Sequence, residues 1–234
     1  MKTYTVTSKD LDKNNNYIGK LGVANLDGNL EIEENLGIVT FRSLNVLGYI
    51  FAKAGCGIKA DYEIKAGSGI KAGSGIEAGS GIKAGGRIEA GSGIKAGSGI
   101  EAGCGIIAGS GIEADYEIKA GSGIEAGSGI KAGDRIEAGS GIKAGSGIEA
   151  GSGINCKLEL KFNYRLFAGI SIYQNEEIAI KDIICGKLVG PGKVCYGNVK
   201  ELGLPSDEKK SPCNMSEKVV KVEIDGVKYE AIIK

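Results

Sequence analysis

The residues best suited to recognise a partner are those that interrupt a repetitive stretch in the middle of the chain. Residues 61–63 and 115–117 both read Asp-Tyr-Glu where the surrounding repeat has Gly-Ser-Gly, and they lie 54 residues apart. Tyrosine and arginine are enriched among the side chains that contribute most to protein–protein binding. We therefore predict a protein-contact surface, with drift in a repeat array as the competing explanation. The candidate contact residues are Tyr62, Glu63, Tyr116, Glu117, Asp134, Arg135 and Arg87.

Residues that could carry catalysis are few. The chain has no histidine, so the commonest general base is absent. Paired carboxylates could replace it, but the glutamates alternate with lysines along the repeat, where charge pairing is the simpler explanation. The six cysteines lack the tight spacing of a zinc site, and the glycine-rich stretch lacks a P-loop motif. The sequence predicts a protein that is not an enzyme, with no catalytic residue, no metal site and no cofactor.

The charge balance and the apolar segments limit the partners. The 29 basic and 29 acidic residues cancel, which removes the electrostatic argument for nucleic acid or an anionic membrane. The N-terminus lacks the apolar core of a signal peptide, and no run of about 18 apolar residues could span a membrane. We expect a cytoplasmic protein with a protein partner and no membrane association; oligomer formation stays open.

The elements that must position the candidate residues come from a six-residue repeat. An isoleucine stands at every sixth position from Ile58 to Ile154, in the unit Ile-(Lys/Glu)-Ala-Gly-Ser-Gly. A period of six does not match a helix of 3.6 residues per turn, and this much glycine would cost a helix about 1 kcal/mol per glycine. Each unit is therefore expected to form a short strand followed by a corner.

The number of units in one coil follows from the charged position after each isoleucine. Charges twelve residues apart nearly always have the same sign, whereas charges eighteen apart nearly always have opposite signs. Lys65 and Lys83 are the exception at eighteen. Stacked strands lie about 4.8 Å apart, a separation at which opposite charges attract and like charges repel. The pattern predicts three units per coil, and hence a three-sided prism.

Residues 52–154 resemble the hexapeptide-repeat proteins, whose three-unit coils form a left-handed parallel β-helix. The resemblance implies that each isoleucine and the serine two positions before it point inward, and that the glycine after alanine turns the corner with positive φ. The family includes acyltransferases and carbonic anhydrases that depend on histidines, which this chain lacks. The unit is also similar to AGxGI-type repeats of uncharacterised bacterial and phage proteins.

The direction in which the serine position points is open at this stage. Tyr62 and Tyr116 occupy it, and a tyrosine does not fit easily into a narrow prism of isoleucines. In the alternative register, isoleucine and alanine point inward and Gly-Ser-Gly forms an exposed corner.

The coil length places the candidate residues relative to one another. A separation of 54 residues is three coils, so Tyr62 and Tyr116 should share a face, about 14 Å apart at the strand spacing. Arg135 follows Glu117 by eighteen residues, which places it one coil away and able to pair with it. Arg87 falls on a different face.

The flanking segments complete an all-β chain of three parts. We expect residues 1–51 to form an N-terminal cap with irregular strands, 52–156 the solenoid and 157–234 a β-rich C-terminal module. Residues 157–162 alternate as a strand does, 170–173 and 178–184 are further strand candidates, and 218–224 with 227–233 flank an Asp-Gly pair typical of a type I′ hairpin.

These features predict a non-catalytic β-solenoid that acts as a scaffold or binds a protein. One specific version is an inhibitor, encoded by a phage or mobile element, of a host defence factor such as a nuclease. A self-assembling filament protein is the main alternative, because a solenoid with open ends can stack. A hexapeptide-type transferase is disfavoured by the absence of histidine.

Overall fold

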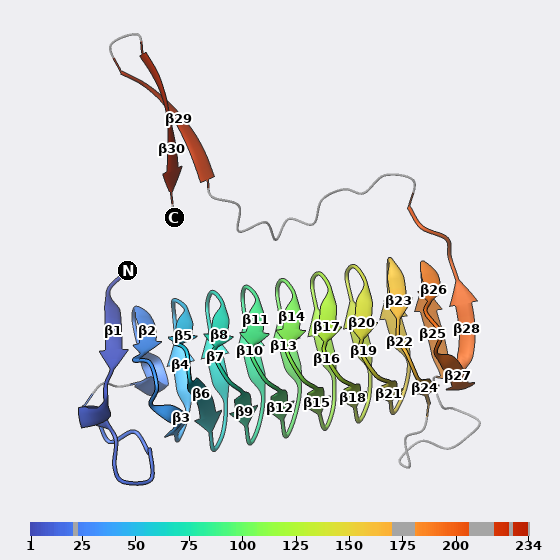
Figure 1. The fold of residues 1–234 in the computed structure, drawn as a ribbon, viewed down its shortest axis with the longest axis horizontal. Coiled ribbons are helices and arrows are strands. Elements are labelled where there is room, and N and C mark those ends of the chain that lie inside the picture. The colour runs from blue at the N-terminus through green and yellow to red at the C-terminus, as the bar shows by residue number, and fades with distance from the viewer. Residues whose placement is uncertain (21–22, 170–180, 206–217, 225–226, 234) are drawn as a thin grey trace.

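The computed structural model describes residues 1–20, 23–169, 181–205, 218–224 and 227–233. Three parallel sheets wrap around one core and form a three-sided β-solenoid, as predicted (Figure 1). Successive strands visit the sheets in turn, so that Ile82 pairs with Ile100, eighteen residues later. The prediction of three six-residue units per coil is confirmed.

The three sheets are named here in the order in which the chain first enters them. The first sheet contains β1 (Thr3–Val6), β2 (Asn29–Ile32), β5 (Ile50–Ala52), β8 (Ile70–Ala72), β11 (Ile88–Ala90), β14 (Ile106–Ala108), β17 (Ile124–Ala126), β20 (Ile142–Ala144), β23 (Glu159–Lys161) and β26 (Lys187–Val189). The second contains β3 (Gly37–Phe41), β6 (Cys56–Ala60), β9 (Ile76–Ala78), β12 (Ile94–Ala96), β15 (Ile112–Ala114), β18 (Ile130–Ala132), β21 (Ile148–Ala150), β24 (Arg165–Ala168) and β27 (Lys193–Tyr196). The third contains β4 (Leu44–Val46), β7 (Ile64–Ala66), β10 (Ile82–Ala84), β13 (Ile100–Ala102), β16 (Ile118–Ala120), β19 (Ile136–Ala138), β22 (Ile154–Cys156), β25 (Asp182–Cys185) and β28 (Asn198–Glu201).

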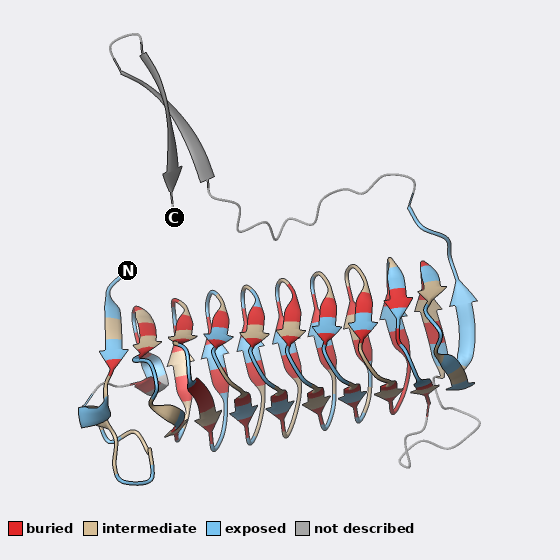
Figure 2. Ribbon diagram, viewed as in Figure 1, coloured by how far each residue is buried: buried red, intermediate tan, exposed pale blue. Residues whose placement is uncertain are grey.

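The core is a stack of isoleucines and alanines. In β14, for example, Ile106 is 0% exposed and Ala108 is 2% exposed, while the residue between them points outward. The serine position lies at the corners instead, exposed or half-buried in the regular coils except at Ser152 in the last one, which is buried (Figure 2). The register expected from the family resemblance is therefore wrong, and the alternative with alanine inward is correct. Strand alternation explains this, because residues i and i+2 share a face and the corner begins directly after alanine.

The glycine after each alanine has a different role from the one predicted. None of these glycines in the regular coils has positive φ. A Cβ atom on Gly109 would instead lie 2.1 Å from the carbonyl oxygen of Gly91 in the preceding coil. The corners also stack through backbone hydrogen bonds, since the amide of Gly109 donates to the carbonyl of Ala90 (3.0 Å). Glycine is favoured at this position by the close approach of neighbouring coils, not by a left-handed turn.

The sheets continue beyond the repeat in both directions. At the N-terminal end, β2 to β5 add less regular coils, and the ring of Tyr17 packs 5.3 Å from that of Phe41. Two short 3-10 helices, η1 (Ser8–Asp10) and η2 (Val23–Asn25), lie in this segment. The side-chain amide of Asn16 donates a hydrogen bond to the Asp12 carboxylate, and this hydrogen bond is the main cause of the lowered pKa of that carboxyl.

After the repeat, β23 to β28 add further coils, with a register shift between Leu166 and Phe167. The predicted strand at 157–162 is present as β23, and the one at 178–184 overlaps β25. The candidate at 170–173 lies outside the described residues. The predicted hairpin is formed by β29 (Lys218–Ile224) and β30 (Val227–Ile233), and its turn at 225–226 is also outside them. Across the described ranges, no helix is long and apolar enough to cross a membrane.

Candidate protein-contact surface

The candidate residues gather mainly at one corner of the prism, between the second and third sheets. In successive coils this corner is formed by residues 42–43, 61–63, 79–81, 97–99, 115–117, 133–135 and 151–153. We call its non-repeat residues the decorated corner: Arg42, Asp61, Tyr62, Glu63, Asp115, Tyr116, Glu117, Asp134 and Arg135. Arg87 lies at the corner between β10 and β11, which joins the third sheet to the first. The predicted separation of Arg87 from the others is confirmed.

The two tyrosines of the decorated corner point into solvent. Tyr62 is 54% exposed and Tyr116 is 63% exposed. Since 54 residues make three coils, their backbones lie about 14 Å apart along the solenoid axis. The guanidinium of Arg42 lies 5.9 Å from the centre of the Tyr62 ring, at the outer range of a cation–π contact. Both rings are thus held on rigid, hydrogen-bonded corners and remain available for contact.

The aspartates before the two tyrosines occupy the position at which other coils have the close-packed glycine. Asp61 has room because the corner above it contains only residues 42–43, one residue fewer than a regular corner. Asp115 follows a full corner, and its amide lies 3.2 Å from the carbonyl oxygen of Ala96. The equivalent bond from Gly109 is 3.0 Å. The coil therefore accommodates the extra Cβ of Asp115 with a small local displacement.

Asp134 and Arg135 form different contacts from those predicted. The hydroxyl of Ser152, one coil later, donates to the carboxylate of Asp134, and the amide of Asp134 donates to the carbonyl of Tyr116 (2.9 Å). Among the described residues, no ion pair joins Arg135 to Glu117. The two residues lie on neighbouring coils, as the spacing indicated, but their side chains do not form an ion pair there. Holding two flexible surface side chains together costs entropy that a surface ion pair barely offsets.

Negative charge is concentrated at this corner although the chain is neutral overall. Within residues 52–156 the acidic corner residues all belong to it, and they are Asp61, Glu63, Asp115, Glu117 and Asp134. Set against Arg42 and Arg135, five carboxylates and two guanidinium groups leave a net charge of −3. Overall neutrality therefore conceals a surface that would attract positive charge.

The flat faces between the corners carry the predicted ladders of opposite charges. On the second sheet the Nζ–Oε distances are 3.0 Å for Lys59 and Glu77, 3.5 Å for Lys95 and Glu113, and 3.6 Å for Lys131 and Glu149. The other two faces contain Lys83–Glu101, Lys119–Glu137, Lys71–Glu89 and Lys143–Glu125. Lys65 stacks on Lys83, a like-charged step inside the repeat, and beyond the repeat Lys161 stacks on Lys143 in the same way. These pairs are exposed, so each contributes little to stability.

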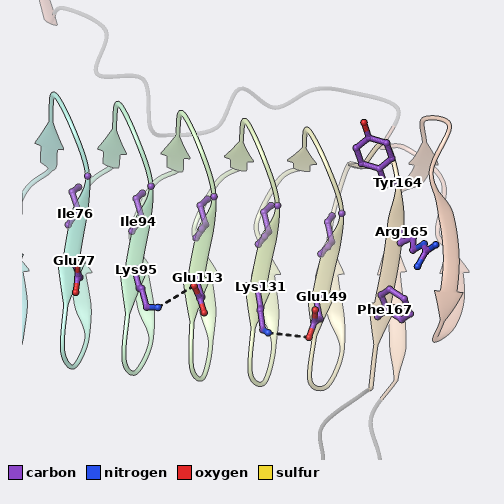
Figure 3. A pocket seen from close by; sticks show the side chains of 18 of the residues that line it. Ile76, Glu77, Ile94, Lys95, Glu113, Lys131, Glu149, Tyr164, Arg165 and Phe167 are labelled. Atoms are coloured by element: carbon purple, nitrogen blue, oxygen red, sulfur yellow. Dashed lines mark ion pairs between the residues drawn. The ribbon is translucent and has the colours of Figure 1, made fainter.

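An open groove of about 890 Å³ runs along the second sheet beside its ladder. Its floor is the column of glycines that precede the isoleucines, Gly75, Gly93, Gly111, Gly129 and Gly147. Figure 3 shows the Lys95–Glu113 and Lys131–Glu149 pairs along it, with Tyr164 and Phe167 near one end. The lining residues within the described chain include no serine, cysteine or aspartate. Such a groove offers an elongated shape with a rim of paired lysines and glutamates.

Among the described cysteines, Cys156 and Cys185 lie close together on the neighbouring strands β22 and β25, while Cys56 and Cys195 lie elsewhere in the fold. The described residues contain no cluster of three or more histidine, cysteine, aspartate or glutamate side chains that could hold a metal ion. Cys56 is buried, and its Sγ donates to the carbonyl oxygen of Glu33. Burial, and to a smaller extent the neighbouring Cys185 thiol, raises the pKa of the Cys156 thiol to about 12. Cys195 is free and exposed.

Sequence reasoning missed three features of this surface. It did not identify Arg42 beside Tyr62, because Arg42 precedes the repeat. The corner 42–43 is one residue short, so the eighteen-residue spacing does not place Arg42 above Tyr62. It missed the glycine-lined groove, whose only signal is the second glycine of each unit. It also missed the local excess of carboxylates, which sorting the corner residues by coil position would have revealed.

The chain matches no protein-family model, no curated protein and no solved structure.

Proposed function

We propose that this protein is a non-catalytic β-solenoid scaffold that binds another protein through the decorated corner. The observation that carries the proposal is the pair of exposed rings of Tyr62 and Tyr116, held at the same corner three coils apart. The proposal includes an architecture similar to that of the hexapeptide-repeat proteins, but without their histidine-dependent chemistry. It also includes a cytoplasmic location.

The rigidity of the corner supports binding. Each corner is hydrogen-bonded to the coil before it, so the backbones of both tyrosines are fixed before a partner arrives. A tyrosine side chain has only two rotatable torsions and a large contact area, so ordering it on binding costs little entropy. Pre-organised contacts of this kind lower the cost of association.

The charge of the corner favours a partner with a basic surface. A net charge of −3 beside two tyrosine rings suits lysine and arginine side chains, which can pair with the carboxylates and stack on the rings. A nuclease or another protein that binds nucleic acid presents such a surface. An inhibitor encoded by a phage or mobile element, directed at a host defence nuclease, is the version of the proposal that fits this charge best.

The test is affinity capture from host lysate with three forms of the protein. Tyr62→Ala combined with Tyr116→Ala removes both rings, and Tyr164→Ala is the matched control because Tyr164 is 68% exposed at a different corner. We expect a basic protein captured by the wild type and by Tyr164→Ala, with at least tenfold less captured by the double variant. Equal capture of that protein by all three forms would exclude the decorated corner as its binding surface.

Self-assembly is the second candidate function, and one observation favours it. The last coil exposes apolar side chains, with Leu202 63% exposed and Leu204 49% exposed, and such an end could stack on another copy. Light scattering on purified protein separates the two functions. A single sharp peak at the mass of a monomer or dimer, unchanged over a hundredfold range of concentration, excludes filaments.

A further inference from the structure

The C-terminal end of the solenoid is an open surface. The strands β26, β27 and β28 are the last members of their three sheets, so each pairs with a strand on one side only. Val199 in β28 is 43% exposed, whereas Ile183, its partner one coil earlier, is 0% exposed. Leu202 and Leu204, which follow β28, are 63% and 49% exposed. Residues of this kind at a solenoid end require a cover that shields both the apolar side chains and the strand edges.

The hairpin of β29 and β30 has one apolar face in its register. The strands pair Val222 with Tyr229 and Ile224 with Val227. Because residues two apart in a strand share a face, the register places an almost entirely apolar set together. That set is Val220, Val222, Ile224, Val227, Tyr229, Ala231 and Ile233, with Lys218 as its one charged member at the start of β29.

The opposite face of the hairpin is largely charged. Its register pairs Lys221 with Glu230 and Glu223 with Lys228, two matches of opposite charge, and pairs Val219 with Ile232 at the strand ends. A two-stranded hairpin is at best marginally stable alone, and it requires packing on one face. The register therefore assigns one face to solvent and the other to a packing partner.

We propose that the apolar face of this hairpin packs on the open C-terminal coil and closes the solenoid. The thirteen residues between Leu204 and Lys218 could span up to about 45 Å, so the tether allows the contact. A short tether gives an effective concentration in the millimolar range, well above that of a second copy in solution. The occupant of the open end is therefore the hairpin of the same chain.

Hydrogen exchange measured by mass spectrometry on the full chain tests this contact. Val220→Asp places a charge on the apolar face, and Val219→Asp places the same charge on the opposite face, one residue away. We expect Val220→Asp to accelerate amide exchange in residues 187–204 at least tenfold, while Val219→Asp leaves it at the wild-type rate. The amides of β9 to β21 serve as the internal reference and should be equally protected in all three proteins.

A reciprocal variant at the solenoid end tests whether the effect depends on the contact, and not only on a change within the hairpin. Leu202→Asp changes only the solenoid end, and we expect it to accelerate exchange in residues 218–233. Unchanged exchange at 187–204 in Val220→Asp would overturn the proposal. Protection at 187–204 that depends on protein concentration would also overturn it, because the cover would then come from a second copy.

Discussion

Glycine is the residue on which the close stacking of the coils depends. Replacing Gly109 with alanine would put a Cβ 2.1 Å from a carbonyl oxygen, whereas the same change at Gly111 would meet its nearest atom at 3.4 Å. We expect Gly109→Ala to lower the free energy of unfolding by about 1–3 kcal/mol, as overpacking does. Gly111→Ala should change it by less than about 0.5 kcal/mol. Equal effects of the two variants in urea unfolding would contradict the steric role assigned to the first glycine.

Cysteine reactivity provides a second test at the residue scale. The thiolate is the reactive form, and a pKa of about 12 for Cys156 leaves roughly one thiol in 10⁴ ionised at pH 8. We expect iodoacetamide to label the exposed Cys195 within minutes and to leave Cys156 unlabelled until the protein unfolds. Peptide mapping by mass spectrometry gives the result. Labelling of Cys156 at the rate of Cys195 in native protein would show that the interior is open there.

The charge ladders act at the scale of whole sheets, and two matched variants measure them. Lys65→Glu replaces the like-charged stack on Lys83 with an opposite pair. Lys95→Glu does the reverse, because Lys95 lies between Glu77 and Glu113. We expect the first variant to raise and the second to lower the free energy of unfolding, each by several tenths to about 1 kcal/mol.

Salt provides the control for these two variants. The Debye length falls to about 3 Å at 1 M salt, so the difference between them should largely disappear there. A difference that persists at high salt would mean that packing, not charge, separates the two proteins.

The sheets also show what the sequence could and could not predict. The alternation of Lys and Glu predicted three units per coil correctly, because charges eighteen residues apart stack at the strand spacing. The inward register was wrong because serine and alanine are both small, and residue volume alone does not tell which one faces the core. Tyr62 and Tyr116 were the signal for the correct register, since a tyrosine is tolerated at a corner but not among isoleucines.

At the scale of the whole molecule, the chain has no net charge, but charged and aromatic residues are unevenly distributed over its surface. The ladders of the regular coils keep each face within one charge of neutral, whereas the decorated corner combines a net charge of −3 with two exposed tyrosines. The shared corner and the three-coil spacing could be predicted from the sequence. Whether Arg135 and Glu117 actually pair could not, because the repeat does not determine the conformations of surface side chains. A stiff solenoid can present such groups at a fixed spacing to a rigid partner.

The most direct test of this role moves one ring without changing the composition. Ser98→Tyr combined with Tyr116→Ser shifts the second ring one coil closer to Tyr62, from about 14 Å to about 10 Å. Both positions lie in the same column of the corner, and the unfolding curve should stay at that of the wild type. For the protein captured by the wild type, we predict a Kd at least tenfold weaker in calorimetric titration. An unchanged Kd would show that the spacing of the tyrosines does not matter and would contradict the decorated corner as the binding surface.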